Sequence, residues 1–232
     1  MKFTIASLGA CALLAGAMPA TAQEPAEPAP QAPAASSEQV PSAMAQALDG
    51  FHVAILEDSD GGMASVQNDQ GENALVVFLE PAAAEAAQQN PAVADMSVAP
   101  VPLMLLLSAW NGPIAFEGSP QAIEQANDLM PDMQGSFGAP TFFVLTDGNE
   151  TQIDNGQGPI TPVLLSYADA DEMASKLQEQ GVEESSISIM PIEFGSVLQE
   201  LNTMPQDFGY RVFTHPGTVE LIQAQQPGDT AQ

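Results

Sequence analysis

The sequence is poor in cysteine and in basic residues. Cys11 is its one cysteine, and 3 residues are Lys or Arg against 30 Asp or Glu, for a formal net charge of −27. A single cysteine allows no intrachain disulfide. Nucleic-acid binding is excluded because it requires many cationic groups to displace counterions from phosphates. Anionic lipid head groups are disfavoured for the same reason.

Histidine is also scarce, and the motifs of common enzymes are missing. His52 and His215 stand at unrelated positions, so no repeated metal or catalytic arrangement can include them. The chain has no GxSxG elbow, no Walker loop and no dinucleotide fingerprint. No spacing singles out a glycosidase pair among the 30 carboxylates. We therefore predict that the protein is not an enzyme, with no catalytic residue, no metal site and no cofactor.

One acidic turn resembles a calcium loop. In Asp58-Ser59-Asp60-Gly61-Gly62 the first two carboxylates have EF-hand spacing. Gly62, however, stands at the third carboxylate position, and Met63 stands where the glycine belongs. A hairpin turn explains this segment without an ion.

Residues 1–22 have the pattern of a cleavable signal peptide. Lys2 precedes an apolar run that is too short to span a bilayer, and Ala20 and Ala22 suit signal peptidase. We expect cleavage after Ala22 and export to the periplasm, with no integral membrane segment afterwards. Leu8-Gly9-Ala10-Cys11 resembles a lipobox, which leaves a lipoprotein as the alternative. If Cys11 is removed, the mature chain has no thiol, and its stability must come from a packed core.

The composition divides the rest of the chain into three parts. Residues 23–43 are rich in Pro, Ala, Glu, Gln and Ser and form a predicted linker, because they cannot bury enough surface to fold. Residues 223–232 form a predicted flexible tail. The folded part is then residues 44–222, which suffices for one domain or two small ones.

An internal repeat organises this folded part. The first copy, 44–135, and the second, 136–222, contain matching apolar runs and helical stretches in the same order. The strand pairs are 51–58 with 140–147, 75–79 with 162–165, 98–103 with 187–192, and 114–116 with 211–213; the helix pairs are 82–89 with 168–180, and 121–129 with 218–222. This order predicts an α+β fold made of two tandem copies of one unit, related by a pseudo-twofold axis. Prolines in the third strand of each copy place it at a sheet edge or a bulge.

A thioredoxin-like interpretation competes with the repeat. Residues 103–113 resemble a thioredoxin strand and active-site turn without its cysteines, and Gly138-Ala139-Pro140-Thr141-Phe142 resembles the cis-proline loop. Only 26 residues separate Pro113 from Pro140, too few for the elements that a thioredoxin domain has there. Redox chemistry also requires a thiol. We therefore prefer the repeat.

Methionine is abundant, with nine residues after the signal segment, among them Met130, Met133, Met190 and Met204. Such side chains fill gaps in a core, and they also suit a surface that accepts many apolar sequences. A copper site at Met130 and Met133 is disfavoured because no further ligand stands at a suitable spacing.

The order of motifs resembles the Tic22 family over about 44–222. The segments that carry the resemblance are Gly138-Ala139-Pro140-Thr141-Phe142, the Thr161–Ala170 stretch leading into an acidic helix, Val98-Ala99-Pro100-Val101-Pro102-Leu103, and the closing Arg211-Val212-Phe213-Thr214-His215-Pro216-Gly217. The chain departs from the family pattern at Phe78-Leu79 and Leu164-Leu165, where the family has aromatic pairs, and it lacks the family's basic residues.

The resemblance implies a periplasmic, chaperone-like protein that binds unfolded or outer-membrane-bound polypeptides in transit and supports outer-membrane biogenesis. It supplies no catalytic residues. The alternative is a non-catalytic envelope module with one dedicated folded partner, and a third hypothesis is an uncharacterised hydrolase. The sequence leaves the binding residues, the clients and the oligomeric state open.

Overall fold

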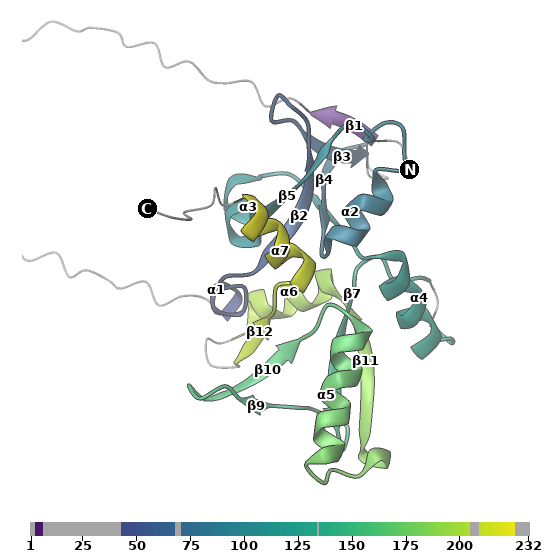
Figure 1. Ribbon diagram of the computed structural model, residues 1–232, viewed down its shortest axis with the longest axis vertical. Coiled ribbons are helices and arrows are strands. Elements are labelled where there is room, and N and C mark those ends of the chain that lie inside the picture. The colour runs from purple at the N-terminus through teal and green to yellow at the C-terminus, as the bar shows by residue number, and fades with distance from the viewer. Residues whose placement is uncertain (1–2, 7–42, 68–70, 134, 205–208, 226–232) are drawn as a thin grey trace, which may run out of the picture.

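The computed structural model describes residues 3–6, 43–67, 71–133, 135–204 and 209–225. Most of the predicted signal peptide, Cys11, the predicted linker up to residue 42, and residues 226–232 of the predicted tail lie outside these ranges. The described residues form an elongated α+β structure with two halves, one above the other (Figure 1).

The upper half in Figure 1 is built on one mixed sheet. Its elements are β1 (Phe3–Ala6), α1 (Ala43–Ala47), β2 (His52–Glu57), β3 (Met63–Gln67), β4 (Asn73–Phe78), α2 (Pro81–Ala87), β5 (Ser97–Pro102), α3 (Leu103–Ala109), β6 (Ile114–Glu117) and α4 (Pro120–Leu129). The strand order is β1-β3-β2-β4-β6, with β5 paired to β2. β6 runs parallel to β4, and the other pairs are antiparallel.

The lower half continues the chain with shorter hairpin strands. Its elements are β7 (Pro140–Thr146), β8 (Asn149–Glu150), β9 (Ile153–Asp154), β10 (Pro159–Val163), α5 (Tyr167–Glu179), a 3-10 turn (Glu184–Ser186), β11 (Ile187–Glu193), α6 (Phe194–Thr203), β12 (Tyr210–Val212) and α7 (Pro216–Gln225). Strands β11-β7-β8 and β12-β10-β9 form two small sheets. An isolated bridge between Phe142 and Leu164 joins them.

The strands and helices predicted from the sequence are confirmed, apart from their ends. β2 and β7 each enter an antiparallel hairpin, with β3 and β8. The proline-containing strands are edges, because among the described strands β5 pairs only with β2, and β11 only with β7. Residues 103–109, which resemble a strand in the sequence, form helix α3 instead.

Local signals explain where two helices begin and where one of them ends. The Ser119 hydroxyl accepts a hydrogen bond from the Ala122 backbone N–H (3.2 Å), and Pro120 is the first residue of α4. Ser166 caps α5 in the same way at the Asp169 N–H (3.1 Å). Gly181, with φ of 92°, follows the end of that helix, where a left-handed residue favours glycine.

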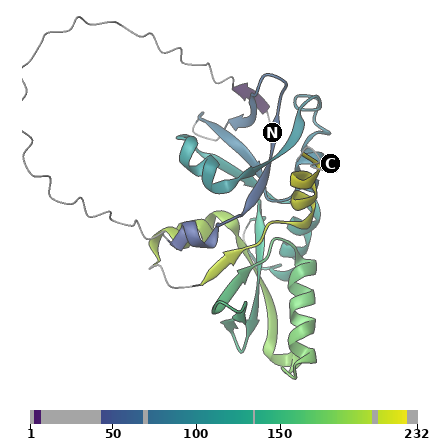
Figure 2. The same ribbon diagram turned by 60° about the vertical axis from the view of Figure 1, so that its left-hand side comes forward.

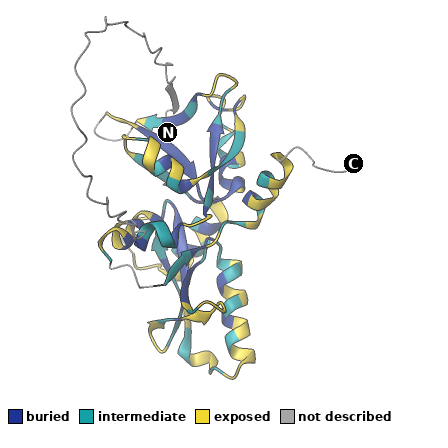
Figure 3. Ribbon diagram, turned by 90° about the vertical axis from the view of Figure 1, so that its left-hand side faces the viewer, coloured by how far each residue is buried: buried dark blue, intermediate teal, exposed yellow. Residues whose placement is uncertain are grey.

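The core has three apolar clusters on the two faces of the strands. The largest joins both halves and contains α1, α3 and α6. The second packs α2 on the other face of the upper sheet. The third packs α4 and α5 on the lower strands. Figure 2 shows α1, α3 and α6 on one side of the strands, with α5 and α7 on the other side, and Figure 3 shows that the buried residues gather on the strands.

The two halves exchange their last helices. α4 follows the upper strands in the chain but contacts β7, β11 and α5 of the lower half. α7 follows the lower strands but contacts β2, β5 and α2 of the upper half. Each half therefore needs a helix from the other to cover its strands.

Candidate functional site

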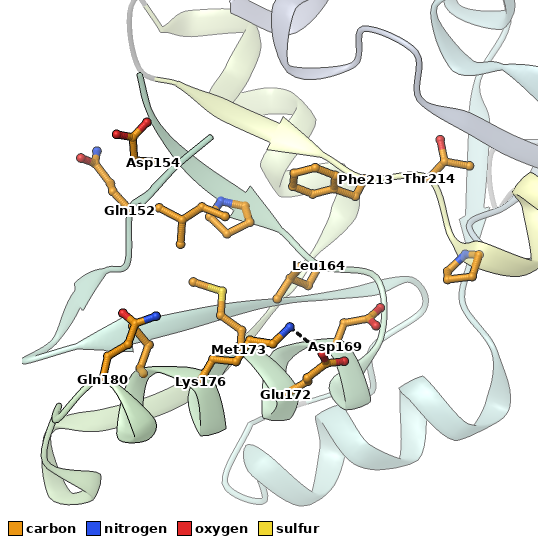
Figure 4. Close-up of a pocket in the computed structure, with 14 residues that line it drawn as sticks. Gln152, Asp154, Leu164, Asp169, Glu172, Met173, Lys176, Gln180, Phe213 and Thr214 are labelled. Carbon is orange, nitrogen blue, oxygen red and sulfur yellow. Dashed lines mark ion pairs between the residues drawn. The ribbon is translucent and has the colours of Figure 1, made fainter. Parts of the chain in front are cut away.

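A groove of about 600 Å³ lies in the lower half between helix α5, strands β9 and β10, and the segment that leaves β12 (Figure 4). Its apolar lining consists of Ile153, Pro162, Leu164, Met173, Leu177, Phe213 and Pro216. Phe213 is 48% exposed and Ile153 is 37% exposed. Large apolar side chains left this exposed around one cavity are typical of a binding surface.

The residues of helix α5 that line the groove lie on one face of the helix. Asp169, Met173, Lys176, Leu177 and Gln180 follow the i, i+4, i+7, i+8 pattern of one helix face. On the face towards the strands, the helix carries the small buried residues Ala170 and Ala174, which allow close packing on β7. One face of α5 is therefore packed tightly on the strands, while the face that lines the groove carries flexible side chains such as Met173.

The rim of this groove carries more negative than positive charge. Glu172 and Lys176 form an exposed i, i+4 ion pair at 2.6 Å, and the hydrogen bond from Lys176 lowers the pKa of Glu172. Such an exposed pair contributes little to stability. Asp154 accepts a hydrogen bond from the Gly156 N–H (2.8 Å), and Asp169 accepts one from the Ser166 hydroxyl (2.7 Å). Three carboxylates and one ammonium group thus surround an apolar floor.

A second, smaller groove of about 230 Å³ lies in the upper half. Its lining consists of Val76, Phe78, Ala83, Ala86, Ala87, Glu117, Gly118, Pro120 and Ile123, from β4, α2, the end of β6 and the start of α4. The larger groove is formed by β10, α5, the end of β12 and the start of α7, which have the same places in the element order.

The difference in volume between the two grooves does not come from their helix side chains. Ala86 and Ala87 stand where α5 has the much larger Glu172 and Met173, 86 positions later. Smaller side chains alone would leave more room. The lower groove is larger because it is also bordered by the β9 hairpin, where Gln152, Ile153 and Asp154 reach over the cavity.

Glu117 is the one lining residue of the smaller groove with a shifted pKa among the residues described. Burial, and the nearby charge of Glu193, raise the pKa of its carboxyl. Glu193 itself accepts hydrogen bonds from the Gly138 N–H (3.2 Å) and the Ala139 N–H (2.8 Å). These contacts hold Glu193 where the halves meet, and burial together with its nearby charge favours the protonated form of Glu117.

Comparison with known proteins gives structural matches only. No protein-family model matches the sequence, and no curated protein matches it. Among solved structures, Anabaena Tic22, described as a protein of protein transport, matches with a TM-score of 0.58 and 18% identity, covering 78% of this chain and 96% of that one. Tic22 from Plasmodium falciparum matches with a TM-score of 0.55 and 12% identity, covering 77% and 94%.

The fold is that of Tic22.

This finding confirms the resemblance that the sequence motifs indicated. Within the described part of the chain, no helix combines the length and apolar character needed to cross a membrane.

Within the Tic22 fold, the two histidines hold connections between the halves. His52 Nδ1 lies 2.9 Å from the Gly50 carbonyl, and the His52 N–H donates to the Thr214 hydroxyl (3.0 Å). His215 Nδ1 accepts from the Gly217 N–H (3.2 Å), and its Nε2 lies 3.6 Å from the buried carboxylate of Glu80. Each histidine thus has a local structural partner.

The acidic turn after β2 is a hairpin. The Asp58 carboxylate accepts hydrogen bonds from the N–H groups of Asp60 (2.9 Å) and Gly62 (2.7 Å). The Asp58 side chain therefore stabilises the turn by hydrogen bonds to the backbone of the turn itself.

The methionines have both kinds of surroundings. Met204 packs against the largest core cluster, whereas Met130 and Met133 are 42% and 37% exposed beyond the end of α4. Met173 lines the larger groove, and sequence reasoning did not single it out. The signal that pointed nearest to the site was the closing motif around Phe213.

Proposed function

We propose that this protein is a periplasmic, chaperone-like protein that binds extended, partly unfolded polypeptides in transit and supports protein transport and outer-membrane biogenesis. The observation that carries the proposal is the pair of apolar grooves at matching places in the two halves. The Tic22 fold supports it, because the Anabaena protein is described as a protein of protein transport.

The same proposal includes the organisation of the chain. A cleaved signal peptide at 1–22 and a linker at 23–43 precede two copies, 44–135 and 136–222, related by a pseudo-twofold axis. The repeated order of elements and the reciprocal exchange of α4 and α7 support this arrangement. The role is non-catalytic.

Apolar burial supplies a binding energy suited to transient contacts. One large client side chain that leaves water for the groove contributes about 1.5–3 kcal/mol. Ordering an extended client offsets part of this gain. Binding therefore stays reversible, and client release needs no energy source. Because the driving force is apolar, salt does not abolish it.

The test is suppression of aggregation of an unfolded outer-membrane protein, at physiological and at high salt. We expect suppression at a near-equal molar ratio under both conditions. Phe213→Ser and Met173→Ser should weaken it, because each makes the lining of the larger groove polar. Leu105→Ser is the matched control, since Leu105 is 57% exposed on α3, away from both grooves. Absence of suppression at any ratio would reject the proposal.

The alternative is a non-catalytic envelope module with one dedicated folded partner. Exposed Leu105 favours it, because Met104 of the same helix and Trp110 at its end are also apolar and only partly buried. Under this alternative, Leu105→Ser abolishes capture of one partner from a periplasmic extract, while Phe213→Ser and Met173→Ser have no effect.

A further inference from the structure

One edge of the upper sheet is covered by a segment that the sequence predicts to be removed. Strand β1 pairs antiparallel with β3 in the register Phe3↔Val66, Thr4↔Ser65, Ile5↔Ala64 and Ala6↔Met63. β1 lies inside the predicted signal peptide, 1–22. If cleavage follows Ala22, the mature protein keeps β3 but loses the strand beside it.

The hydrogen-bonding directions on β3 follow from two bonds nearby. The Leu75 N–H donates to the Pro113 carbonyl (3.0 Å), so the main-chain groups of Leu75 face β6 and those of Ala74 face β3. Ala74 pairs with Val66, which therefore faces β4. The Asp58 N–H also donates to the Gly62 carbonyl (2.9 Å), so the main-chain groups of Gly62 face β2. Gly62 is an even number of residues from Val66, so both bonds give the same alternation along β3.

Because these directions alternate along a strand, Ala64 and Val66 bond within the sheet. The N–H and C=O groups of Met63, Ser65 and Gln67 point the other way, towards β1. Across this edge, Thr4 and Ser65 form a hydrogen-bonded pair, and the N–H of Ile5 points away from β3.

This edge lacks the features that keep other sheet edges from pairing. Edge strand β5 contains Pro100 and Pro102, and edge strand β11 contains Pro191 and ends at Glu193. β3, with the sequence Met-Ala-Ser-Val-Gln, has neither a proline nor a charged residue. Proline and charge are the usual means by which proteins prevent an edge from accepting a further strand.

We propose that the β3 edge of the processed protein is a second binding site, which accepts an extended, apolar segment of another polypeptide as an added antiparallel strand. The first occupant is the chain's own Phe3-Thr4-Ile5-Ala6 before cleavage. Main-chain bonds supply the affinity, so a wide range of apolar sequences fits. This site lies in the upper half and shares no lining residue with either groove, so it goes beyond the function proposed above.

Residue-resolved amide hydrogen exchange tests the proposal in three samples. They are the full chain 1–232, the form processed during export with its N-terminus defined by mass spectrometry, and that form with a peptide of residues 2–10 added. We expect the N–H groups of Met63 and Ser65 to exchange at least about tenfold more slowly in the first and third samples than in the second. Those of Ala64 and Val66 should be protected in all three.

Two modified peptides give a matched control. A methyl group on the nitrogen of Thr4 removes a ladder hydrogen bond and should abolish the protection, whereas one on the nitrogen of Ile5 should leave it intact. Equal effects of the two peptides would overturn the proposal. So would equal exchange in the full and processed chains, or a processed form that still contains residues 3–6. Phe213→Ser should not change the exchange pattern, so failure of the grooves is distinguishable from failure of this edge.

Discussion

The ring of Phe194 meets the ring of Phe116 edge to face, with centroids 5.0 Å apart and planes at 86°. Phe116 comes from β6 of the upper half, and Phe194 is the fully buried first residue of α6 in the lower half. Phe51 contacts the same ring at 5.9 Å. One side chain therefore links elements far apart in the sequence at the centre of the shared core.

We predict that Phe194→Ala lowers the free energy of unfolding by about 3–5 kcal/mol, because it leaves a cavity and removes two ring contacts. Urea denaturation followed by circular dichroism measures the change. Phe213→Ala is the control, since its ring is half exposed and its loss should cost under about 0.5 kcal/mol. Equal losses in the two variants would contradict the arrangement of the core.

Two glycines should respond to alanine with opposite signs. At Gly118, a Cβ atom would lie 2.9 Å from the Pro140 ring, and the Gly118 N–H donates to the Gly138 carbonyl at 2.8 Å. Gly118→Ala should therefore destabilise the protein by about 1–3 kcal/mol. Gly195 lies in α6 with open space around its Cβ position, so Gly195→Ala should stabilise it by about 0.5–1 kcal/mol. Thermal melting of both variants checks the two signs.

Glu117 should make the stability of the protein fall as pH rises. Burial and Glu193 raise its pKa above the ordinary 4.5, so the folded state binds a proton more tightly than the unfolded state. The free energy of unfolding then decreases from about pH 4.5 upwards, until the pH passes the folded-state pKa. Glu117→Gln should match the wild type at acidic pH and exceed it at neutral pH.

The measurement for this prediction is urea denaturation across the pH range 3.5–8, chosen to bracket ordinary carboxyl titration. Glu124→Gln removes an exposed carboxylate from α4 and controls for the loss of one negative charge. If both variants gain the same stability at neutral pH, net charge is the cause and the local account of Glu117 is wrong.

Tyr210 should resist ionisation while the protein is folded. Its hydroxyl donates a hydrogen bond to the Glu150 carboxylate, and burial together with this bond raises the pKa of the phenol above 10.0. Because the folded state keeps the proton, the contribution of Tyr210 to stability is present below about pH 10 and is lost as pH rises further. Tyr210→Phe should cost about 0.5–1.5 kcal/mol at pH 7 and remove this alkaline loss.

Ultraviolet absorbance of phenolate during an alkaline titration checks the ionisation directly. The chain has two tyrosines, so Tyr167→Phe leaves a sample in which only Tyr210 reports. Absorbance that rises before the protein unfolds would contradict the prediction.

Strands β2 and β7 could be predicted from the sequence because each apolar run ends in a turn signal, at Asp58 and Gly61 or at Asp147 and Gly148. Helix α3 could not, and helix α6 was not predicted although Phe194, Val197, Leu198 and Leu201 have helical spacing. Leu103-Met104-Leu105-Leu106-Leu107 has no helical periodicity and no capping side chain, and it follows β5 without a loop. It is helical because Leu103 and Leu106 pack into the shared core, a tertiary effect.

The groove could not be predicted either. Phe213 looks like the end of an apolar strand, and strands usually bury such residues. Its exposure arises because the chain leaves β12 after Val212 to place α7 on the other half. No local sequence signal predicts that the chain leaves the strand after Val212. The lining residues Met173 and Leu177 also pack against the third core cluster, so their sequence spacing does not distinguish them from core residues.

Because α4 and α7 each cover the other half, the fold cannot be completed until the last helix of the chain is available. A chain that crosses a membrane from its N-terminus delivers β2 and β5 early, but the helix that covers them, α7, is the last described element. The strands of the upper half therefore stay incompletely covered until the chain is available up to about residue 225. Such long-range closure makes folding slow and the intermediate prone to associate. If the chain is exported as we propose, it is during transit itself a polypeptide with exposed apolar strands.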